Sequence, residues 1–266
     1  MMLPSAILLL TEAVIFDGCS LTETNTETIN DIRNKTINGG TIMILEGKII
    51  DFLGDSITEG VGVTDRDNNR YDNVLKKMCN LKATHNYGIG GTRFAHQSVP
   101  SEKPRHDLCF CGRVYDLNVD ADIIVVYGGV NDYIHGDAPI GSFGDETPAT
   151  FYGAVRFLMN FLTTTYPDKQ IVFMAPARMC YKDLTGYEPS NRPVKRADAL
   201  PLYNYVEIIT KTAAQFQIPV LDLYQELGID PMREEDKLRY TADGLHFNDA
   251  GHHIIAKRLA DFLQAL

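Results

Sequence analysis

The sequence IIDFLGDSITEG occupies residues 49–60. Its first part is short, apolar and β-branched at the start, which is typical of a strand buried on both faces of a parallel sheet. Ser56 follows the carboxyl end of that strand. Because open α/β sheets bind their ligands at this edge, both position and residue type make Ser56 a candidate nucleophile.

The chain downstream of this strand alternates apolar runs with helical periodicity, as stacked β-α units do. Further strands are predicted over 83–87, 123–127, 171–174 and 219–221. Five strands separated by helices predict an α/β protein with a three-layer α/β/α sandwich. The predicted catalytic domain covers residues 46–266.

Apolar residues at helical spacing predict the helices. Val74, Leu75, Met78 and Leu81 form a short amphipathic stripe, and a second helix spans 202–216. Thr147 with Pro148 reads as the cap and first turn of the helix that carries Phe151 to Leu162. Asn248 is the expected cap of the last helix, whose inward residues are Ile255, Leu259, Phe262, Leu263 and Leu266.

Composition limits the function. With 266 residues, 44% of them hydrophobic, the chain can bury the core of one full-sized domain. A net charge of −10 gives no electrostatic footprint for nucleic acid, and it disfavours membrane surfaces as partners. Five cysteines form no disulfide framework, so we expect Cys109 and Cys111 to be free thiols in a reducing compartment, the cytoplasm.

Residues 1–45 lack a clear period and are interpreted as an N-terminal arm of unknown role. Leu3 to Leu10 is apolar enough to suggest the core of a signal peptide. No lysine or arginine precedes Arg33, however, and Glu12 follows at once. A secretory signal normally has a basic start, so secretion is kept only as the alternative location.

Polar clusters follow the predicted strands, and parallel strands bring all their carboxyl ends to one edge. Acyl transfer needs a hydroxyl, an imidazole base, a carboxylate that holds the imidazole tautomer, and donors for the oxyanion. Ser56, His246 and Asp243 supply the first three. The amides of Ser56 and Gly91 and the side-chain NH2 of Asn131 supply donors.

Four blocks of the chain resemble those of the SGNH (GDSL-like) hydrolases, in the order of that family. They are Gly54-Asp55-Ser56-Ile57-Thr58, Asn86-Tyr87-Gly88-Ile89-Gly90-Gly91, Gly129-Val130-Asn131-Asp132 and Asp243-Gly244-Leu245-His246. The resemblance implies a flavodoxin-like sheet of order 2-1-3-4-5. It also implies Ser56 as nucleophile, Gly91 and Asn131 as oxyanion donors, and His246 and Asp243 as base and orienter. Gly90 departs from the family, which often has serine there.

Other motifs favour structural roles. His252, His253 and Asp249 could suggest a metal site, but the group lacks a convincing third ligand. These residues are interpreted as solvated residues at a helix start. Asp132 is expected to bond nearby amides rather than to act in catalysis. Asp51 interrupts an apolar strand, and a buried carboxylate needs hydrogen-bond donors. No nucleotide-binding glycine loop is complete, and no cofactor or metal is expected.

The sequence therefore predicts a serine esterase acting on a small-molecule or saccharide ester. The loops 135–146 and 176–201 should form the rim, the second with Arg178, Tyr181, Tyr187 and Arg192. A polar, aromatic rim favours a short acyl group, such as acetyl, on a polar carrier. A thioesterase or lysophospholipase, and a non-catalytic glycan-binding protein, remain alternatives. An imidazole base predicts that activity declines as the pH falls through roughly 6 to 7.

Overall fold

The computed structural model describes residues 36–37, 40–41, 43–180 and 200–266. Its centre is a five-stranded parallel sheet of spatial order β4-β3-β5-β6-β7, which is the predicted order 2-1-3-4-5. The strands are β1 (Thr36–Ile37), β2 (Gly40–Thr41), β3 (Ile49–Gly54), β4 (Ala83–Gly88), β5 (Ile123–Tyr127), β6 (Gln170–Ala175) and β7 (Val220–Asp222). β1 and β2 form a separate antiparallel pair.

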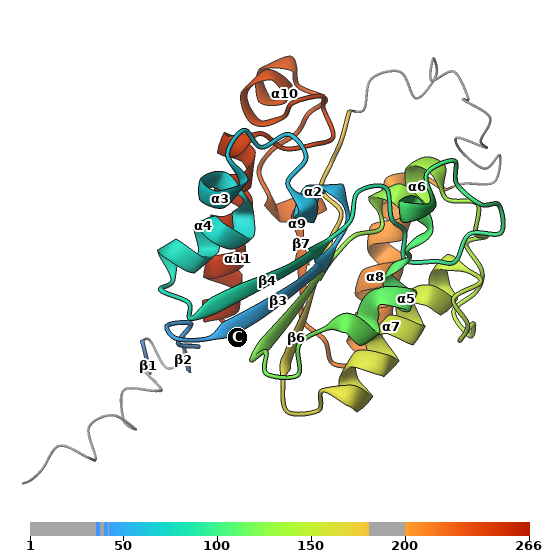
Figure 1. The fold of residues 1–266 in the computed structure, drawn as a ribbon, viewed down its shortest axis with the longest axis horizontal. Coiled ribbons are helices and arrows are strands. Elements are labelled where there is room, and N and C mark those ends of the chain that lie inside the picture. Colours follow the sequence, from blue (N-terminus) through green and yellow to red (C-terminus); the bar gives the residue numbers. More distant parts are fainter. Residues whose placement is uncertain (1–35, 38–39, 42, 181–199) are drawn as a thin grey trace, which may run out of the picture.

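Helices flank the sheet on both sides (Figure 1). The α-helices are α2 (Ser56–Glu59), α3 (Arg66–Asn69), α4 (Tyr71–Met78), α5 (Phe110–Arg113), α6 (Val130–His135), α7 (Phe151–Thr165), α8 (Leu202–Gln215), α9 (Leu223–Glu226), α10 (Glu234–Tyr240) and α11 (Asp249–Gln264). Two short 3-10 turns are η1 (Pro104–Asp107) and η2 (Val114–Asp116).

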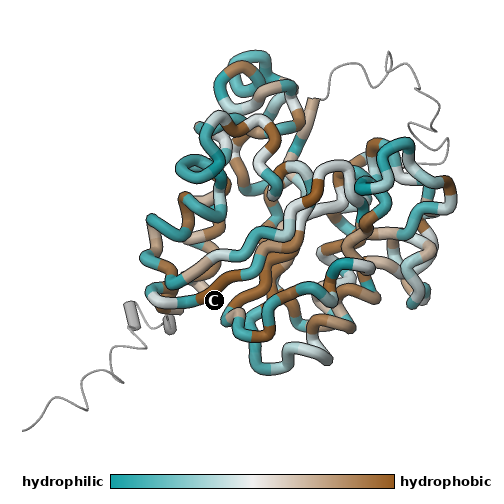
Figure 2. Tube along the Cα trace, in the orientation of Figure 1, coloured by the Kyte–Doolittle hydropathy of each residue, from teal (hydrophilic) through white to brown (hydrophobic). Residues whose placement is uncertain are grey.

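Two apolar cores lie on opposite faces of the sheet. One joins α5, α7 and α8 to Leu53, Ile124 and Val126, and the other joins α4 and α11 to Phe52 and Val125. The central strands are hydrophobic along their length, as Figure 2 shows. This pattern is expected of parallel strands covered on both faces, and it gives the three-layer α/β/α architecture.

The first three strands of the sheet end level with one another. In the register, Gly54 lies opposite Gly88 of β4 and Tyr127 of β5. The segments that follow these strands therefore emerge side by side at one edge, which is where the polar blocks of the sequence are gathered.

Asp51 is fully buried in β3, and it finds the donors that its position requires. Its carboxylate lies 2.7 Å from His85 Nδ1 and accepts a 2.7 Å hydrogen bond from the Asn118 amide. Cys109 and Cys111 are buried free thiols, as predicted.

Three predictions about helix positions are wrong. Of the four residues in the predicted stripe, Val74, Leu75 and Leu81 are buried, but Met78, the last residue of α4, is half exposed and Leu81 lies beyond the helix. Thr147 and Pro148 precede α7 rather than start it, because the Thr150 hydroxyl caps the helix by accepting from the Gly153 amide at 3.0 Å. Leu266 is exposed because α11 ends two residues earlier.

The end of the predicted N-terminal arm packs on the domain. Leu45 is buried in the core beside α4 and α11, and the Met43 amide donates to the Gln264 carbonyl at 3.0 Å. Most of residues 1–45, including the apolar stretch Leu3 to Leu10, lies outside the described residues. Within the described part of the chain, no helix combines the length and apolar character needed to cross a bilayer.

Candidate active site

The turn between β3 and α2 carries Ser56. Gly54 and Gly88 permit this turn, because a Cβ on Gly54 would overlap the Thr58 side chain and one on Gly88 would overlap the backbone of Glu59. α2 therefore lies directly on the ends of β3 and β4. The Asp55 carboxylate caps α2 by accepting from the Ile57 amide at 3.0 Å, which fixes Ser56 at the first helical position.

Ser56, His246 and Asp243 form one continuous set of side-chain contacts. His246 Nε2 lies 3.0 Å from Ser56 Oγ, and His246 Nδ1 lies 2.7 Å from Asp243 Oδ2. Ser56 and His246 are separated by 190 positions in the sequence and meet at the carboxyl edge of the sheet. The structure thus brings together the three residues that the sequence singled out.

Asp243 is held so that one oxygen faces the ring. Its other oxygen, Oδ1, accepts from the amides of Leu245 and His246 at 2.9 and 2.7 Å. Partial burial alone would raise the pKa of Asp243, but the hydrogen bonds from the His246 ring and backbone outweigh it and lower that pKa. Asp243 is therefore ionised and can hold a proton on His246 Nδ1, which leaves Nε2 to accept from Ser56.

Gly91 lies in the loop after β4, with a φ of +77° that favours glycine. A side chain there would also collide with the His106 ring. The preceding Gly90 lies beside Ser56, since a Cβ built on it would be 3.4 Å from the serine Cβ. The Gly90 amide donates to Glu59 Oε2 at 2.7 Å, so the loop that carries Gly91 is attached to α2.

Asn131 is buried on α6, beside the turn between β3 and α2. Its Nδ2 lies 3.0 Å from the Thr92 carbonyl and 3.3 Å from Asp55 Oδ2. The side-chain NH2 group of Asn131 therefore points toward Asp55, the residue before Ser56. Both hydrogens of this NH2 group face protein acceptors. Asp132, the next residue, accepts from the Phe94 and Ala95 amides and has the structural role expected of it.

Two buried charges lie under the site. Burial raises the pKa of Asp55 to about 6, although the Ile57 amide and the charges of His246 and Arg113 act in the opposite direction. The Arg113 guanidinium donates to the carbonyls of Gly54, the last residue of β3, and Tyr87, the last but one of β4. It thus stabilises the strand ends from which the site is built.

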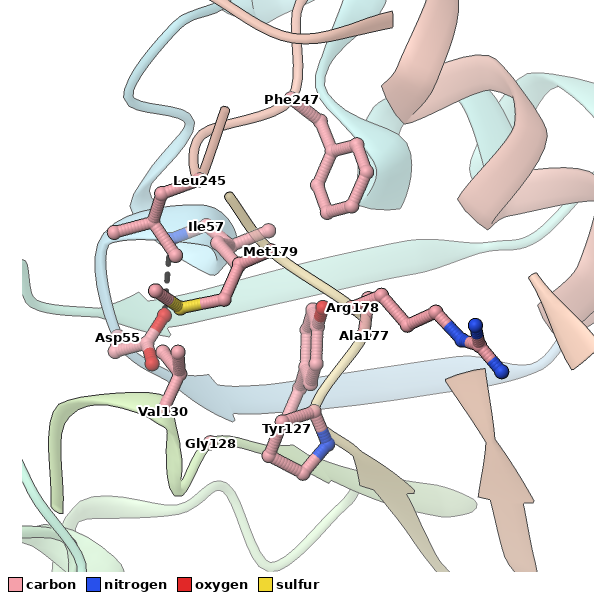
Figure 3. A pocket seen from close by; sticks show the side chains of 11 residues that line it. Asp55, Ile57, Tyr127, Gly128, Val130, Ala177, Arg178, Met179, Leu245 and Phe247 are labelled. Carbon is pink, nitrogen blue, oxygen red and sulfur yellow. Dashed lines mark hydrogen bonds between the residues drawn. The ribbon is translucent and has the colours of Figure 1, made fainter. Parts of the chain in front are cut away.

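A small, mostly apolar cavity lies beside the turn between β3 and α2 (Figure 3). Asp55 and Ile57 flank Ser56 and line it, as do Leu245 and Phe247, which flank His246. Met179 contributes to its wall, and the Tyr127 hydroxyl is buried there. The wall of the cavity is thus formed in part by the sequence neighbours of Ser56 and His246.

The sequence analysis also singled out His252 and four residues of the second rim loop. His252 is fully buried rather than solvated, because its Nδ1 accepts from the Tyr71 amide at 3.2 Å and its ring stacks on Tyr71. Arg178 stacks on Tyr224 and pairs with Asp230 at 3.2 Å, so its charge is used within the protein. Tyr181, Tyr187 and Arg192 lie outside the described residues. No trio of His, Cys, Asp or Glu side chains suited to a metal occurs in the part of the chain that the structure describes.

Sequence reasoning missed five side chains that support this edge: Asp55, Glu59, Arg93, Arg113 and His135. Asp55 and Glu59 lie within the opening stretch and could have been noticed as a helix cap and as an acid in the first turn of that helix. His135 follows Asn131 by four residues, a spacing that places both on one face of a helix. Arg93 gives no local signal, because its role depends on contacts between separate loops.

A model of the GDSL-like lipase/acylhydrolase family matches residues 52–254, from β3 into α11. The chain belongs to this family. The matched region contains all five residues that were predicted to form the site. Membership in this family of acylhydrolases indicates an ester hydrolase.

Solved structures agree on the fold. A protein from Lactobacillus plantarum is 29% identical with a TM-score of 0.68, over 82% of this chain and 97% of that chain. A lipase/acylhydrolase from Enterococcus faecalis is 18% identical with a TM-score of 0.53, covering 82% of this chain and 95% of that chain. A carbohydrate acetylesterase family member from Sinorhizobium meliloti is 17% identical with a TM-score of 0.57, covering 80% and 96%. The last two show the fold alone. A search of curated proteins found no match.

Proposed function

We propose that this acylhydrolase is a serine esterase in which Ser56 is the nucleophile, His246 the base and Asp243 the residue that orients His246. The contact of 3.0 Å between His246 Nε2 and Ser56 Oγ is the observation that carries the proposal. It is reinforced by the 2.7 Å contact between His246 Nδ1 and Asp243 Oδ2, which favours the tautomer that the reaction needs.

In the first half of the reaction, Ser56 Oγ forms a bond to the ester carbonyl carbon while its proton passes to His246 Nε2. The bond to the alcohol oxygen then breaks, and His246 returns the proton to the departing alcohol. In the second half, water attacks the acyl-enzyme and gives its proton to His246, and the acid leaves as Ser56 regains a proton.

The oxyanion of each tetrahedral intermediate would be held by the amides of Ser56 and Gly91 and by Asn131 Nδ2. For Asn131 this requires one hydrogen to leave a protein acceptor. The contact with Asp55 Oδ2, at 3.3 Å, is the longer of its two contacts and is the one we expect to be exchanged for the oxyanion.

The proposed substrate is a short acyl ester, such as an acetyl ester, on a polar carrier such as a saccharide. A polar entrance supports this choice. Arg105 pairs with Glu59 at 2.9 Å next to the Gly90-Gly91 loop, and half of its side chain remains exposed to donate to hydroxyl or carbonyl oxygens of a carrier.

The test is hydrolysis of p-nitrophenyl acetate by the parent and by Ser56→Ala, with Ser142→Ala in an exposed loop as the matched control. We expect S56A to lose turnover and S142A to keep it. Equal turnover by S56A and the parent would refute the assignment of Ser56. A panel of acetylated saccharides and of acyl esters of graded length then tests the substrate, and an optimum at long chains would contradict the short-acyl proposal.

A further inference from the structure

Helix α6 places His135 one turn after Asn131, on the same face. His135 Nε2 lies 3.0 Å from Asn131 Oδ1, the oxygen of the amide whose nitrogen faces the nucleophile turn. The other ring nitrogen, Nδ1, lies 3.1 Å from Nη1 of the Arg93 guanidinium. The ring of His135 therefore connects a buried arginine to a proposed oxyanion donor.

The chemistry of the three groups fixes the direction of both hydrogen bonds. A guanidinium has only donors, so His135 Nδ1 must accept from Arg93. A neutral ring that accepts at Nδ1 carries its proton on Nε2, and that N–H can only donate to the amide oxygen of Asn131. The opposite end of Asn131 agrees with this direction, because Nδ2 faces two acceptors, the Thr92 carbonyl and Asp55.

Arg93 also contacts the loop that carries the second proposed donor. Its Nη1 donates to the Gly91 carbonyl at 3.1 Å, and its Nη2 donates to Asp107 and Ser101 at 3.0 and 3.1 Å. The side chain is only 2% exposed. A rigid, buried guanidinium thus joins the Gly91 loop to the helix of Asn131, and it holds both donors relative to one another.

We propose that His135, held in one tautomer by Arg93, is a positioning residue that fixes the amide of Asn131 with its nitrogen toward the oxyanion. The proposal rests on the proposed function, because Asn131 matters to turnover only if an oxyanion forms there. Without His135, the oxygen of the Asn131 amide loses its donor, and the contacts of Nδ2 with the Thr92 carbonyl and Asp55 are left to orient the group. The donor would then spend part of its time turned away from the reacting carbonyl.

The kinetic test compares His135→Leu with His135→Gln. Leucine removes both hydrogen bonds, whereas glutamine can place an N–H near the position of Nε2. We expect kcat for p-nitrophenyl acetate to fall about 10- to 100-fold in H135L with KM within about threefold of the parent, less than the 10²- to 10³-fold cost of losing an oxyanion donor altogether. H135Q should recover most of the loss.

A double-mutant cycle with Asn131→Ala separates positioning from general damage. If His135 acts through Asn131, H135L in the N131A background causes no further loss of kcat. His253 supplies the matched control, because its Nε2 lies 3.2 Å from Asn69 Oδ1 at an exposed site, and H253L should behave as the parent. Parent-like kcat in H135L, or losses that multiply in the double mutant, would overturn the proposal.

A spectroscopic measurement is independent of turnover. In protein with ¹⁵N-labelled histidine, the signals of His135, assigned by their absence in H135L, should show the neutral tautomer protonated at Nε2 at pH 7.5. A ring protonated at Nδ1, or at both nitrogens, would refute the proposed hydrogen-bond direction. If S56A retained full turnover, the proposed function would fail, and this measurement would still decide the tautomer of His135.

Discussion

Glu59 Oε2 accepts a 2.7 Å hydrogen bond from the Gly90 amide, so the helix that begins with Ser56 also holds the loop that carries Gly91. Burial favours the neutral acid, but the hydrogen bonds from Arg105 and Gly90 prevail and lower the pKa of Glu59. The carboxylate is therefore charged and is a strong acceptor at neutral pH. One side chain couples the position of the proposed nucleophile to that of a proposed oxyanion donor.

Glu59→Ala should reduce kcat about tenfold or more, because the peptide between Gly90 and Gly91 loses its anchor and the Gly91 amide is less well directed. Glu59→Gln keeps an oxygen acceptor for Gly90 and should lose less. Kinetics on p-nitrophenyl acetate measure both. Glu207→Ala, which removes only an i,i+4 pair with Lys211 on α8, is the control. A kcat for E59A equal to that of E207A would contradict the coupling.

Asp243→Asn should lower kcat by about 10²- to 10⁴-fold with little effect on folding. Asparagine keeps the oxygen that accepts from the Leu245 and His246 amides, but it presents an NH2 group to His246 Nδ1 in place of Oδ2. The histidine tautomer that can accept from Ser56 is then disfavoured. Asp261→Asn, at an exposed pair with Lys257, controls for loss of a charge. If D243N and D261N turned over alike, Asp243 would have no part in orienting the base.

His252 should make the protein sensitive to acid. Burial lowers the pKa of His252 to about 4, below the ordinary value of 6.5. As the pH falls, the His252 ring is therefore protonated in the unfolded chain before it is protonated in the folded protein. The free energy of unfolding falls by on the order of 2 to 3 kcal/mol as the pH drops from about 6.5 to about 4. His252→Asn keeps an acceptor for the Tyr71 amide without titrating. Urea unfolding should show a smaller acid loss in H252N than in the parent, whereas the exposed His253→Asn should match the parent. Parallel curves for parent and H252N would contradict this origin.

Asp132 should act in the opposite direction. Burial raises the pKa of Asp132 to about 7, despite the hydrogen bonds from the Phe94 and Ala95 amides. Its folded pKa exceeds the unfolded value of 3.8, so its contribution to stability is complete below about pH 4 and is lost as the pH rises toward 7.

Asp132→Asn removes this titration but can accept from only one of the two amides. The mutant should be less stable than the parent, and the difference in unfolding free energy should shrink between pH 4.5 and 7.5. The pKa of Asp55 is also raised, but Asp55 contributes equally to the unfolding free energy of the parent and of the mutant, so its contribution cancels in the difference. The exposed Asp168→Asn is the control, and a difference that stayed constant with pH would show that Asp132 is ionised in the folded protein over this whole range.

Much of the fold was predictable because the sheet is buried on both faces. Continuous apolar runs such as 123–127 admit few other interpretations, and all five predicted strands agree with the observed ones to within one or two residues. Helix starts were less predictable. Both Thr147 and Thr150 are suitable caps, and only contacts to the preceding loop, such as that from the Phe151 amide to the Pro139 carbonyl, favour the second.

For the site, the sequence predicted which residues meet but not what supports them. Ser56, Asp243 and His246 lie in short blocks whose order implies convergence at one edge. Arg93 and His135 lie in separate segments, and their contact depends on the tertiary path of the loop after β4. The same holds for His252. Its local sequence predicts a solvated position, but the side chain is buried because α11 packs on Tyr71.

Helix α11 starts three residues after His246 and runs back across the domain for 16 residues, about 24 Å, until its Gln264 carbonyl meets the Met43 amide. Leu266 therefore lies at the end of the sheet remote from Ser56 (Figure 1). A bulky group attached at Leu266 would therefore leave the edge that carries Ser56 and His246 open to bulk solvent.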